Sequence, residues 1–198
     1  MREGKNIVEV GSLAPDYMGF IFYKDSPRYV GFEFQIPADL PASTMKVGVF
    51  VNETAEGILS AIKNHQLDFV QLHGDESVAY CNNLKEKGIK IIKVFRVDDA
   101  FDFSVTSEFS DVAEYLLFDT KGKSYGGNAI KFDWKLLRKY NNKIPFFLSG
   151  GIDSESIKDI LSLSKLNLHA IDINSGVELS PGLKSITKVS EAINNLRL

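Results

Sequence analysis

Short apolar runs alternate with helix-like segments along the whole chain. Seven apolar runs, each closed by polar or turn-forming residues, predict buried β-strands at 15–22, 46–51, 67–72, 89–95, 115–119, 144–148 and 170–173. Apolar spacing, caps and stop residues predict helices at 6–11, 55–62, 77–87, 134–140, 153–163 and 186–196. Segments 32–40 and 101–114 are poorly patterned, and we expect at most one short helix in each. Strands and helices that alternate through short connections are typical of a parallel sheet with helical crossovers.

The order of these elements favours a closed barrel. The first predicted element is a helix rather than a strand, and the polar or glycine-containing loops follow the carboxyl ends of strands. This is the pattern of a (βα)8 TIM barrel whose first strand would lie upstream of Met1. We therefore expect an α/β fold with a single TIM-barrel domain over residues 1–198 that lacks the first strand. An open doubly wound sheet is the alternative.

Composition restricts the class of protein further. The 198 residues are 44% hydrophobic and 25% charged, which suits one globular domain with a sizeable core. The net charge is −3 and the basic residues are scattered, so we expect neither nucleic acid nor a membrane as a partner. No apolar run reaches the length of a membrane span and no signal-peptide pattern stands at the first residues, so we expect a cytoplasmic protein.

Cysteine and histidine are too sparse for a structural metal or disulfide framework. The single cysteine, Cys81, has no partner for an internal disulfide. The histidines at His65, His73 and His169 are far apart in sequence, so we expect no metal site. Cys81 falls within a predicted helix, away from the expected pocket, and we interpret it as a structural thiol.

The predicted strand that begins at residue 115 ends on a carboxylate. Apolar residues run directly into Asp119, and a polar, glycine-containing loop follows. A charged group inside a sheet would lose its hydration at a cost of roughly several kcal/mol, whereas at the carboxyl end of the strand it can face a pocket. Parallel α/β proteins keep their chemistry at that end. Asp119 is therefore a candidate catalytic residue, and a cap of the next turn is the alternative.

Glycine-containing loops follow the last two predicted strands. Gly150 and Gly151 follow one strand, and Asn174, Ser175 and Gly176 follow the other. Loops at these positions of a barrel present backbone N–H groups to a phosphate. The alternative is that the glycines only make tight turns, but a pair of such loops at consecutive strand ends favours a phosphate site.

Two more side chains follow predicted strands. Arg28 stands just beyond the first strand, where its guanidinium could bind a carboxylate through two parallel hydrogen bonds. A solvated loop arginine fits the spacing equally well. His73 ends another strand and could line the pocket, although a packed or capping histidine is the commoner outcome.

Several motifs together resemble one family, phosphoribosylanthranilate isomerase. They cover nearly the whole chain in the family's order, and they are highly specific together although no single one would be. The motifs are Pro15-Asp16-Tyr17-Met18-Gly19-Phe20-Ile21-Phe22, Ser26-Pro27-Arg28-Tyr29-Val30, Val47-Gly48-Val49-Phe50, Val70-Gln71-Leu72-His73-Gly74-Asp75-Glu76, Leu117-Phe118-Asp119-Thr120, Phe132-Asp133-Trp134, Ser149-Gly150-Gly151, Ser175-Gly176-Val177-Glu178 and Pro181-Gly182.

The resemblance implies a cofactor-free isomerase of tryptophan biosynthesis. It would convert the small phosphorylated substrate N-(5-phosphoribosyl)anthranilate to 1-(2-carboxyphenylamino)-1-deoxyribulose 5-phosphate by an Amadori rearrangement. By the family's pattern Asp119 is the general acid that opens the ribose ring to a Schiff base, and Arg28 holds the anthranilate carboxylate. The glycine loops and Ser175 hold the phosphate, and we place His73 and Asp172 in the same substrate site. We expect a monomer or a homodimer.

The family's general base is not found in this chain. That base is a cysteine at the end of the first strand, and the start Met1-Arg2-Glu3 is similar to the tail of its motif. Cys81 cannot replace it because it falls in another element. A missing central strand costs on the order of 10 kcal/mol, which matches the whole stability of a domain. We therefore expect a chain that is marginally stable or associates through the gap, with little or no isomerase activity.

Two other functions stay open on the sequence alone. A barrel that binds a sugar phosphate without catalysis would suit a chain that lacks the base. Indole-glycerol-phosphate synthase is a related barrel that shares the phosphate loops, but no lysine-bearing strand end upstream of Arg28 matches its lysine-and-glutamate site. The loop at Gly126-Gly127-Asn128-Ala129 departs from the isomerase pattern, which leaves the role of Asn128 open.

Overall fold

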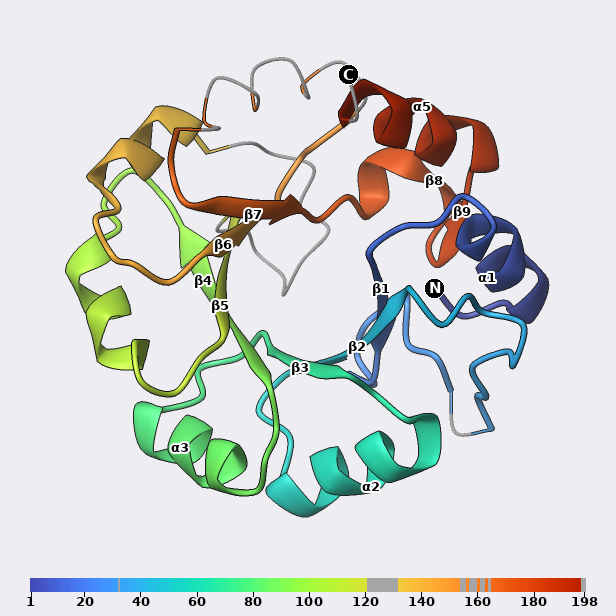
Figure 1. Ribbon diagram of the computed structural model, residues 1–198, viewed down its shortest axis with the longest axis horizontal. Coiled ribbons are helices and arrows are strands. Elements are labelled where there is room, and N and C mark those ends of the chain that lie inside the picture. The colour runs from blue at the N-terminus through green and yellow to red at the C-terminus, as the bar shows by residue number, and fades with distance from the viewer. Residues whose placement is uncertain are drawn as a thin grey trace.

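A computed structural model shows a ring of parallel strands with helices outside it (Figure 1). It describes residues 1–31, 33–120, 132–153, 156, 160, 163 and 165–196. Seven strands form one sheet in chain order, and every neighbouring pair is parallel. They are Tyr17–Ile21 (β1), Met45–Phe50 (β2), Phe69–Leu72 (β3), Ile91–Val97 (β4), Tyr115–Thr120 (β5), Phe146–Leu148 (β6) and Leu168–Ile171 (β7). Each corresponds to a predicted strand.

Helices lie on the outside of the ring. The α-helices are Gly4–Gly11 (α1), Ala55–His65 (α2), Val78–Glu86 (α3) and Ile186–Leu196 (α5), and the 3-10 helices are Phe103–Phe109 (η1), Trp134–Lys139 (η2) and Ser175–Val177 (η3). Capping side chains start two of the α-helices: Thr54 accepts a hydrogen bond from the N–H of Gly57, and Ser77 accepts one from the N–H of Tyr80. The caps that helped to predict these two helices are therefore present in the structure.

The structure differs from the sequence predictions in several local segments. The predicted helices within 101–114 and at 134–140 are short 3-10 helices, which need less apolar periodicity than a full α-helix. The described part of 32–40 contains no helix. Most of the predicted helix at 153–163, and the loop at 126–129, lie outside the described residues. An antiparallel hairpin of Glu178–Ser180 (β8) and Leu183–Lys184 (β9) was not predicted.

The ring is open between β1 and β7. These strands are the two edges of the sheet, and no strand of the described residues pairs with the outer edge of either. Met1 lies beside β1, where its nitrogen donates a hydrogen bond to the carbonyl oxygen of Gly19 at 3.2 Å. Helices α1 and α5 lie outside this part of the ring (Figure 1). The described residues thus form an α/β barrel with the position of one strand unoccupied.

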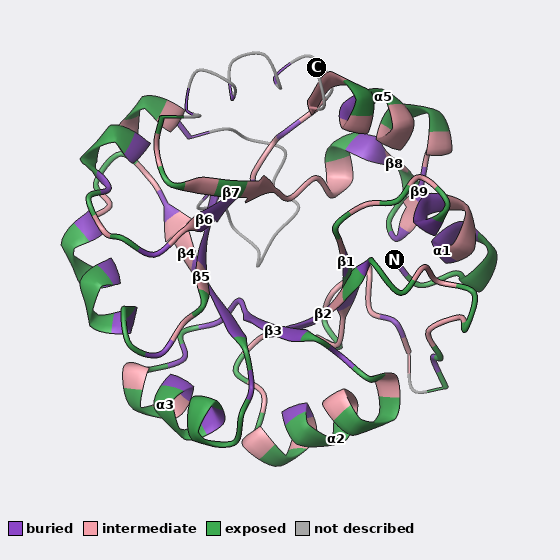
Figure 2. Ribbon diagram, in the orientation of Figure 1, coloured by how far each residue is buried: buried purple, intermediate pink, exposed green. Residues whose placement is uncertain are grey.

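Apolar side chains fill both faces of the sheet. The cluster inside the ring consists of Val47, Phe69, Ile92, Val94, Leu117 and Phe147. A larger cluster lies between strands and helices and includes Ile58, Leu84 and Phe118. Strands β2 to β6 are buried over most of their length (Figure 2), which is why they are continuous apolar runs, whereas β1 and β7 at the two edges are partly exposed.

Candidate active site

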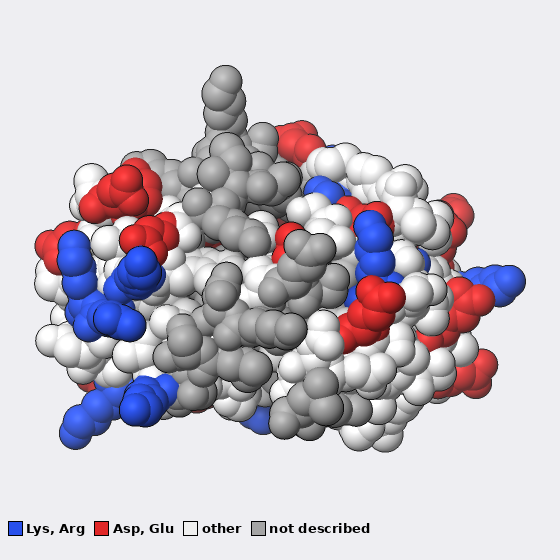
Figure 3. Space-filling view, turned by 90° about the horizontal axis from the view of Figure 1, so that it is seen from above, with Lys and Arg blue, Asp and Glu red and all other residues white. Residues whose placement is uncertain are grey.

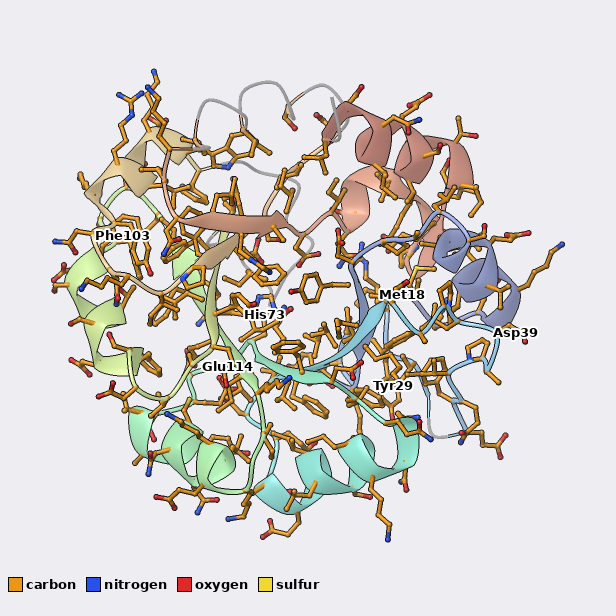
Figure 4. All side chains as sticks on the ribbon, viewed as in Figure 1. Met18, Tyr29, Asp39, His73, Phe103 and Glu114 are labelled. Atoms are coloured by element: carbon orange, nitrogen blue, oxygen red, sulfur yellow. The ribbon has the colours of Figure 1, made fainter. Side chains whose placement is uncertain are left out.

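One cavity of about 560 Å³ lies inside the ring and reaches α5. Its lining contains every residue that the sequence analysis assigned to the site, namely Arg28, His73, Asp119, Gly150, Gly151, Asp172, Ser175 and Gly176. Each stands at or just beyond the carboxyl end of a strand, and Figure 4 shows His73 in the interior of the ring. The shared edge of a parallel sheet therefore brings together residues that are far apart in sequence.

Asp119 and His73 face each other across the cavity wall. Asp119 is 5% exposed, and its Oδ2 lies 3.3 Å from Nε2 of His73. Its Oδ1 accepts a hydrogen bond from the N–H of Thr120 at 2.8 Å, which fixes the carboxyl group. The Nε2 of His73 makes no hydrogen bond with the described residues, because the 3.3 Å approach is not aligned for one. A buried polar atom of this kind can bind a group of a ligand in the cavity.

Asp172 stands one residue beyond β7 and lines the same cavity. Burial raises the pKa of Asp172, and the nearby Asp119 carboxylate raises it further, while Lys184 and His73 act in the opposite direction. Two carboxyl groups therefore share one poorly hydrated space. Burial and the neighbouring carboxylate therefore favour the protonated form of Asp172.

The glycines of the two loops are required by close packing. Gly150 has φ +96°, and a Cβ atom there would lie 2.8 Å from the backbone nitrogen of Thr120. A Cβ atom on Gly176 would lie 2.2 Å from the carbonyl oxygen of Ile152. The loop after β6 thus packs against the end of β5 and against the loop after β7. The glycines do more than make turns, because they let three strand ends converge on one point.

Arg28 is paired rather than free. Its Nε donates to both carboxylate oxygens of Glu178 at 3.0 Å, and its Nη2 donates to Oε2 at 2.7 Å. The side chains of Arg28 and Glu178 are 13% and 6% exposed, so this ion pair is largely buried. Arg28 lines the cavity whereas Glu178 does not. Sequence analysis assigned no role to Glu178, although it belongs to the motif that begins at Ser175.

Lys184 connects this ion pair to a glycine loop. Its Nζ donates to Oε1 of Glu178 at 3.0 Å and to the backbone carbonyl of Asn174 at 2.8 Å. Glu178 and Lys184 are opposite each other in the β8–β9 hairpin. Burial lowers the pKa of Lys184, and the negative charge of Glu178 opposes that shift. The buried side chain of Asn6 holds the backbone of Lys184 through two hydrogen bonds, so α1 fixes the hairpin.

A second buried ion pair supports the loop that carries His73. Nζ of Lys93 lies 2.8 Å from Oε2 of Glu76 and also donates to the carbonyl oxygen of Gly74 at 2.8 Å. The other oxygen of Glu76 accepts hydrogen bonds from the N–H groups of Asn52 and Gly74. This pair joins the interior of β4 to the residues just beyond β2 and β3, so it holds the wall beside His73 in one position.

Cys81 is the structural thiol that the sequence predicted. It lies on α3, is fully buried, and does not line the cavity. Burial raises the pKa of Cys81 to about 11, so it is neither a nucleophile nor a base. In the described part of the chain no group of three or more side chains is placed to hold a metal ion.

The distribution of charge and the length of the helices can be compared directly in the structure. Acidic and basic side chains occur near one another on the face seen in Figure 3. Among the described residues, no helix combines the length and apolar character needed to span a bilayer.

Comparisons with known proteins decide the family. The sequence model of N-(5′-phosphoribosyl)anthranilate isomerase matches residues 1–195. The chain belongs to this family. The N-(5′-phosphoribosyl)anthranilate isomerase of Parabacteroides distasonis is 41% identical over 199 residues, which cover 99% of this chain and 90% of that protein. The phosphoribosylanthranilate isomerase of Thermotoga maritima is 30% identical with a TM-score of 0.84, over 100% of this chain and 95% of that one.

A further solved phosphoribosylanthranilate isomerase is 30% identical with a TM-score of 0.82. The match covers 100% of this chain and 95% of the other chain. That protein is in complex with reduced 1-(o-carboxyphenylamino)-1-deoxyribulose 5-phosphate. As an isomerase-family member with an α/β barrel, this chain is an intramolecular oxidoreductase of tryptophan biosynthesis. The family match sets aside indole-glycerol-phosphate synthase.

Proposed function

We propose that the cavity performs the Amadori rearrangement of N-(5-phosphoribosyl)anthranilate, with Asp119 as the general acid. The buried Asp119 carboxyl at the end of β5 is the observation that carries the proposal: it lies 3.3 Å from the Nε2 of His73, which makes no hydrogen bond within the described residues. As the general acid, Asp119 donates a proton to the ribose ring oxygen as the bond from that oxygen to C1′ breaks. The lone pair of the anthranilate nitrogen forms the C=N bond of the resulting Schiff base.

The polar groups at the cavity wall provide for both ends of this substrate. Arg28 binds the anthranilate carboxylate, and the loops at Gly150–Gly151 and Ser175–Gly176 bind the phosphate through backbone N–H groups. His73 and Asp172 contact the ribose between them. The ligand of the related solved isomerase carries an aromatic carboxylate and a phosphate, which supports a site with partners for both groups.

The second step needs a base that removes the C2′ proton from the Schiff base and yields the enolamine, which tautomerises to the ketose. Cys81 cannot serve because it is buried outside the cavity. We propose that the base belongs to a strand that fills the opening between β1 and β7, as in the family's pattern.

A barrel that binds a sugar phosphate without turning it over is the second candidate. The opening between β1 and β7 favours it, because the described residues place no thiol in the cavity. In either case we propose a cytoplasmic protein with a small phosphorylated ligand. A monomer or a homodimer fits the family, whose Thermotoga maritima member is named dimeric.

Turnover of N-(5-phosphoribosyl)anthranilate, followed by anthranilate fluorescence, tests the proposal. We would compare residues 1–198, a version extended by a strand that carries the family's cysteine, and Asp119→Asn in the extended version. We expect turnover in the extended version only, and a fall of about 10²–10⁴-fold in Asp119→Asn, which is the usual contribution of a general acid. Turnover that persists in Asp119→Asn contradicts the role of Asp119. An extended chain that binds the substrate without turnover supports the binding barrel.

The extended version also tests the role of the opening in stability. A strand that pairs with β1 and β7 removes two exposed edges, so its urea midpoint is expected to be well above that of residues 1–198. Equal midpoints contradict the expectation that the strand belongs in this opening.

A further inference from the structure

The guanidinium of Arg28 offers a ligand only one of its two binding edges. A guanidinium binds carboxylates either side-on, through Nε and Nη2, or end-on, through Nη1 and Nη2. In Arg28 the side edge is occupied, because Nε and Nη2 donate three hydrogen bonds of 2.7–3.0 Å to Glu178. A ligand carboxylate in the cavity is therefore limited to the end edge.

Glu178 is itself held in position from several directions. Its Oε1 accepts hydrogen bonds at 3.0 Å from Nζ of Lys184 and from the N–H of Gly182. Burial by itself raises the pKa of Glu178, but hydrogen bonds from Arg28 and Lys184 and the Lys184 charge outweigh burial and leave the pKa below its ordinary value. Glu178 thus stays ionised at neutral pH and keeps both oxygens available to its partners.

The hairpin that carries Glu178 also reaches the other end of the cavity. Lys184 faces Glu178 across the hairpin and donates to the carbonyl of Asn174, the residue before Ser175. The side chain of Asn6 on α1 fixes the Lys184 backbone with hydrogen bonds of 2.8 and 2.9 Å. These contacts fix the position of Arg28 relative to the glycine loop after β7, although 146 residues separate Arg28 from Asn174.

We infer that Glu178 is a positioning residue that holds Arg28 for end-on binding of the aromatic carboxylate and so sets the preference of the site for carboxylate-bearing anilines. Glu178 does not line the cavity, and it acts on the ligand only through Arg28. The inference rests on the proposed function, because it takes Arg28 as the carboxylate-binding residue.

Charge and geometry predict opposite effects of Glu178→Gln. Removal of the Glu178 charge leaves the cluster more positive, which by itself strengthens the attraction for an anionic ligand. Loss of the two-oxygen acceptor frees the guanidinium to rotate, which weakens end-on pairing. The sign of the change in affinity therefore separates a positioning role from a purely electrostatic one.

The test uses two ligands and fluorescence titration of residues 1–198. One ligand is reduced 1-(o-carboxyphenylamino)-1-deoxyribulose 5-phosphate, and the other is its phenylamino counterpart without the carboxylate. We expect the parent chain to prefer the first, and Glu178→Gln to weaken its binding on the order of tenfold while the second ligand binds as before. Glu9→Gln is the matched control, because it makes the same charge change on the exposed side of α1, and both affinities are expected to stay unchanged.

A double-mutant cycle provides the second measurement. Arg28→Met is expected to remove the preference for the carboxylate, and Glu178→Gln in that background is expected to have no further effect on the preference. Glu178→Asp covers the case in which the glutamine variant does not fold. It keeps the charge but is one methylene shorter, so weaker binding of the carboxylate ligand alone is again expected.

The outcomes separate this inference from the proposed function. Equal or tighter binding of the carboxylate ligand to Glu178→Gln overturns the inference, as does an equal loss for both ligands, which would indicate a merely structural role. If the parent chain binds both ligands without preference, or binds neither, the proposed role of Arg28 fails, and the inference fails with it.

Discussion

The packing of the two glycine loops makes Gly176→Ala the most direct test of the phosphate site. Gly176 has no unusual backbone conformation, so the change acts through space alone. A Cβ atom would lie 2.2 Å from the carbonyl oxygen of Ile152 and 3.2 Å from its carbonyl carbon. Both obstructing atoms belong to the backbone, so no side-chain rotation relieves the overlap. The loops must separate by roughly 0.8 Å to reach the 3.0 Å below which real Cβ contacts essentially never occur.

That displacement is large on the scale of a binding site. A shift of about 1 Å at a positioned group costs on the order of 10²-fold in catalysis, and overpacking costs about 1–3 kcal/mol of stability. We expect Gly176→Ala to bind the reduced product analogue roughly 10- to 100-fold more weakly, with a modest fall in urea midpoint. Titration with inorganic phosphate is expected to show the same loss, because the displaced atoms belong to the loops that we propose bind phosphate.

Gly4→Ala is the control for this substitution. A Cβ atom there would lie 3.8 Å from Pro37, an ordinary contact, and it would sit in the first turn of α1. Alanine favours a helix over glycine by up to about 1 kcal/mol, so the urea midpoint is expected to stay equal or rise while the affinity is unchanged. Unchanged affinity in Gly176→Ala would refute the reasoning, because it would mean that the two loops do not set the phosphate site.

Three further predictions concern buried charges and the thiol. Lys93→Met leaves the buried Glu76 carboxylate without its cation, so we expect the unfolding free energy to fall by about 3–5 kcal/mol. The double variant Lys93→Met with Glu76→Gln is expected to recover part of this loss. An unchanged urea midpoint in Lys93→Met would contradict the prediction. Because the pKa of Glu178 is lowered from 4.5, its stabilisation is complete above that pH and is lost as the pH falls through the lowered value. The difference in urea midpoint between the parent and Glu178→Gln should therefore shrink below pH 4.5, and a constant difference would refute it. Cys81 should react with a thiol reagent at pH 8 only when urea unfolds the chain, and rapid labelling in buffer would show that α3 opens.

The order of the strands, and the convergence of the proposed site residues on one cavity, could be predicted from sequence. Each strand of the ring is an apolar run with turn residues after it, and burial on both faces selects such runs without reference to distant residues. Asp119, His73 and Arg28 were found because parallel strands place all their carboxyl ends at one edge. Where the local pattern was weak, as in 101–114, the type of helix could not be predicted.

The partners of the site residues were decided only by the tertiary structure. Arg28 pairs with Glu178, which is 150 residues away, and Asn6 holds Lys184 across 178 residues. Such pairs form because the curved sheet brings the first and last elements of the chain together, and no local pattern encodes which side chains then meet. The sequence thus determined which residues stand at the mouth of the barrel, since strand periodicity and turn chemistry act over a few residues. Only the curvature of the sheet and the packing of its loops decided that a carboxylate holds Arg28. They also decided that Gly150 and Gly176 let neighbouring backbone segments pack closely together.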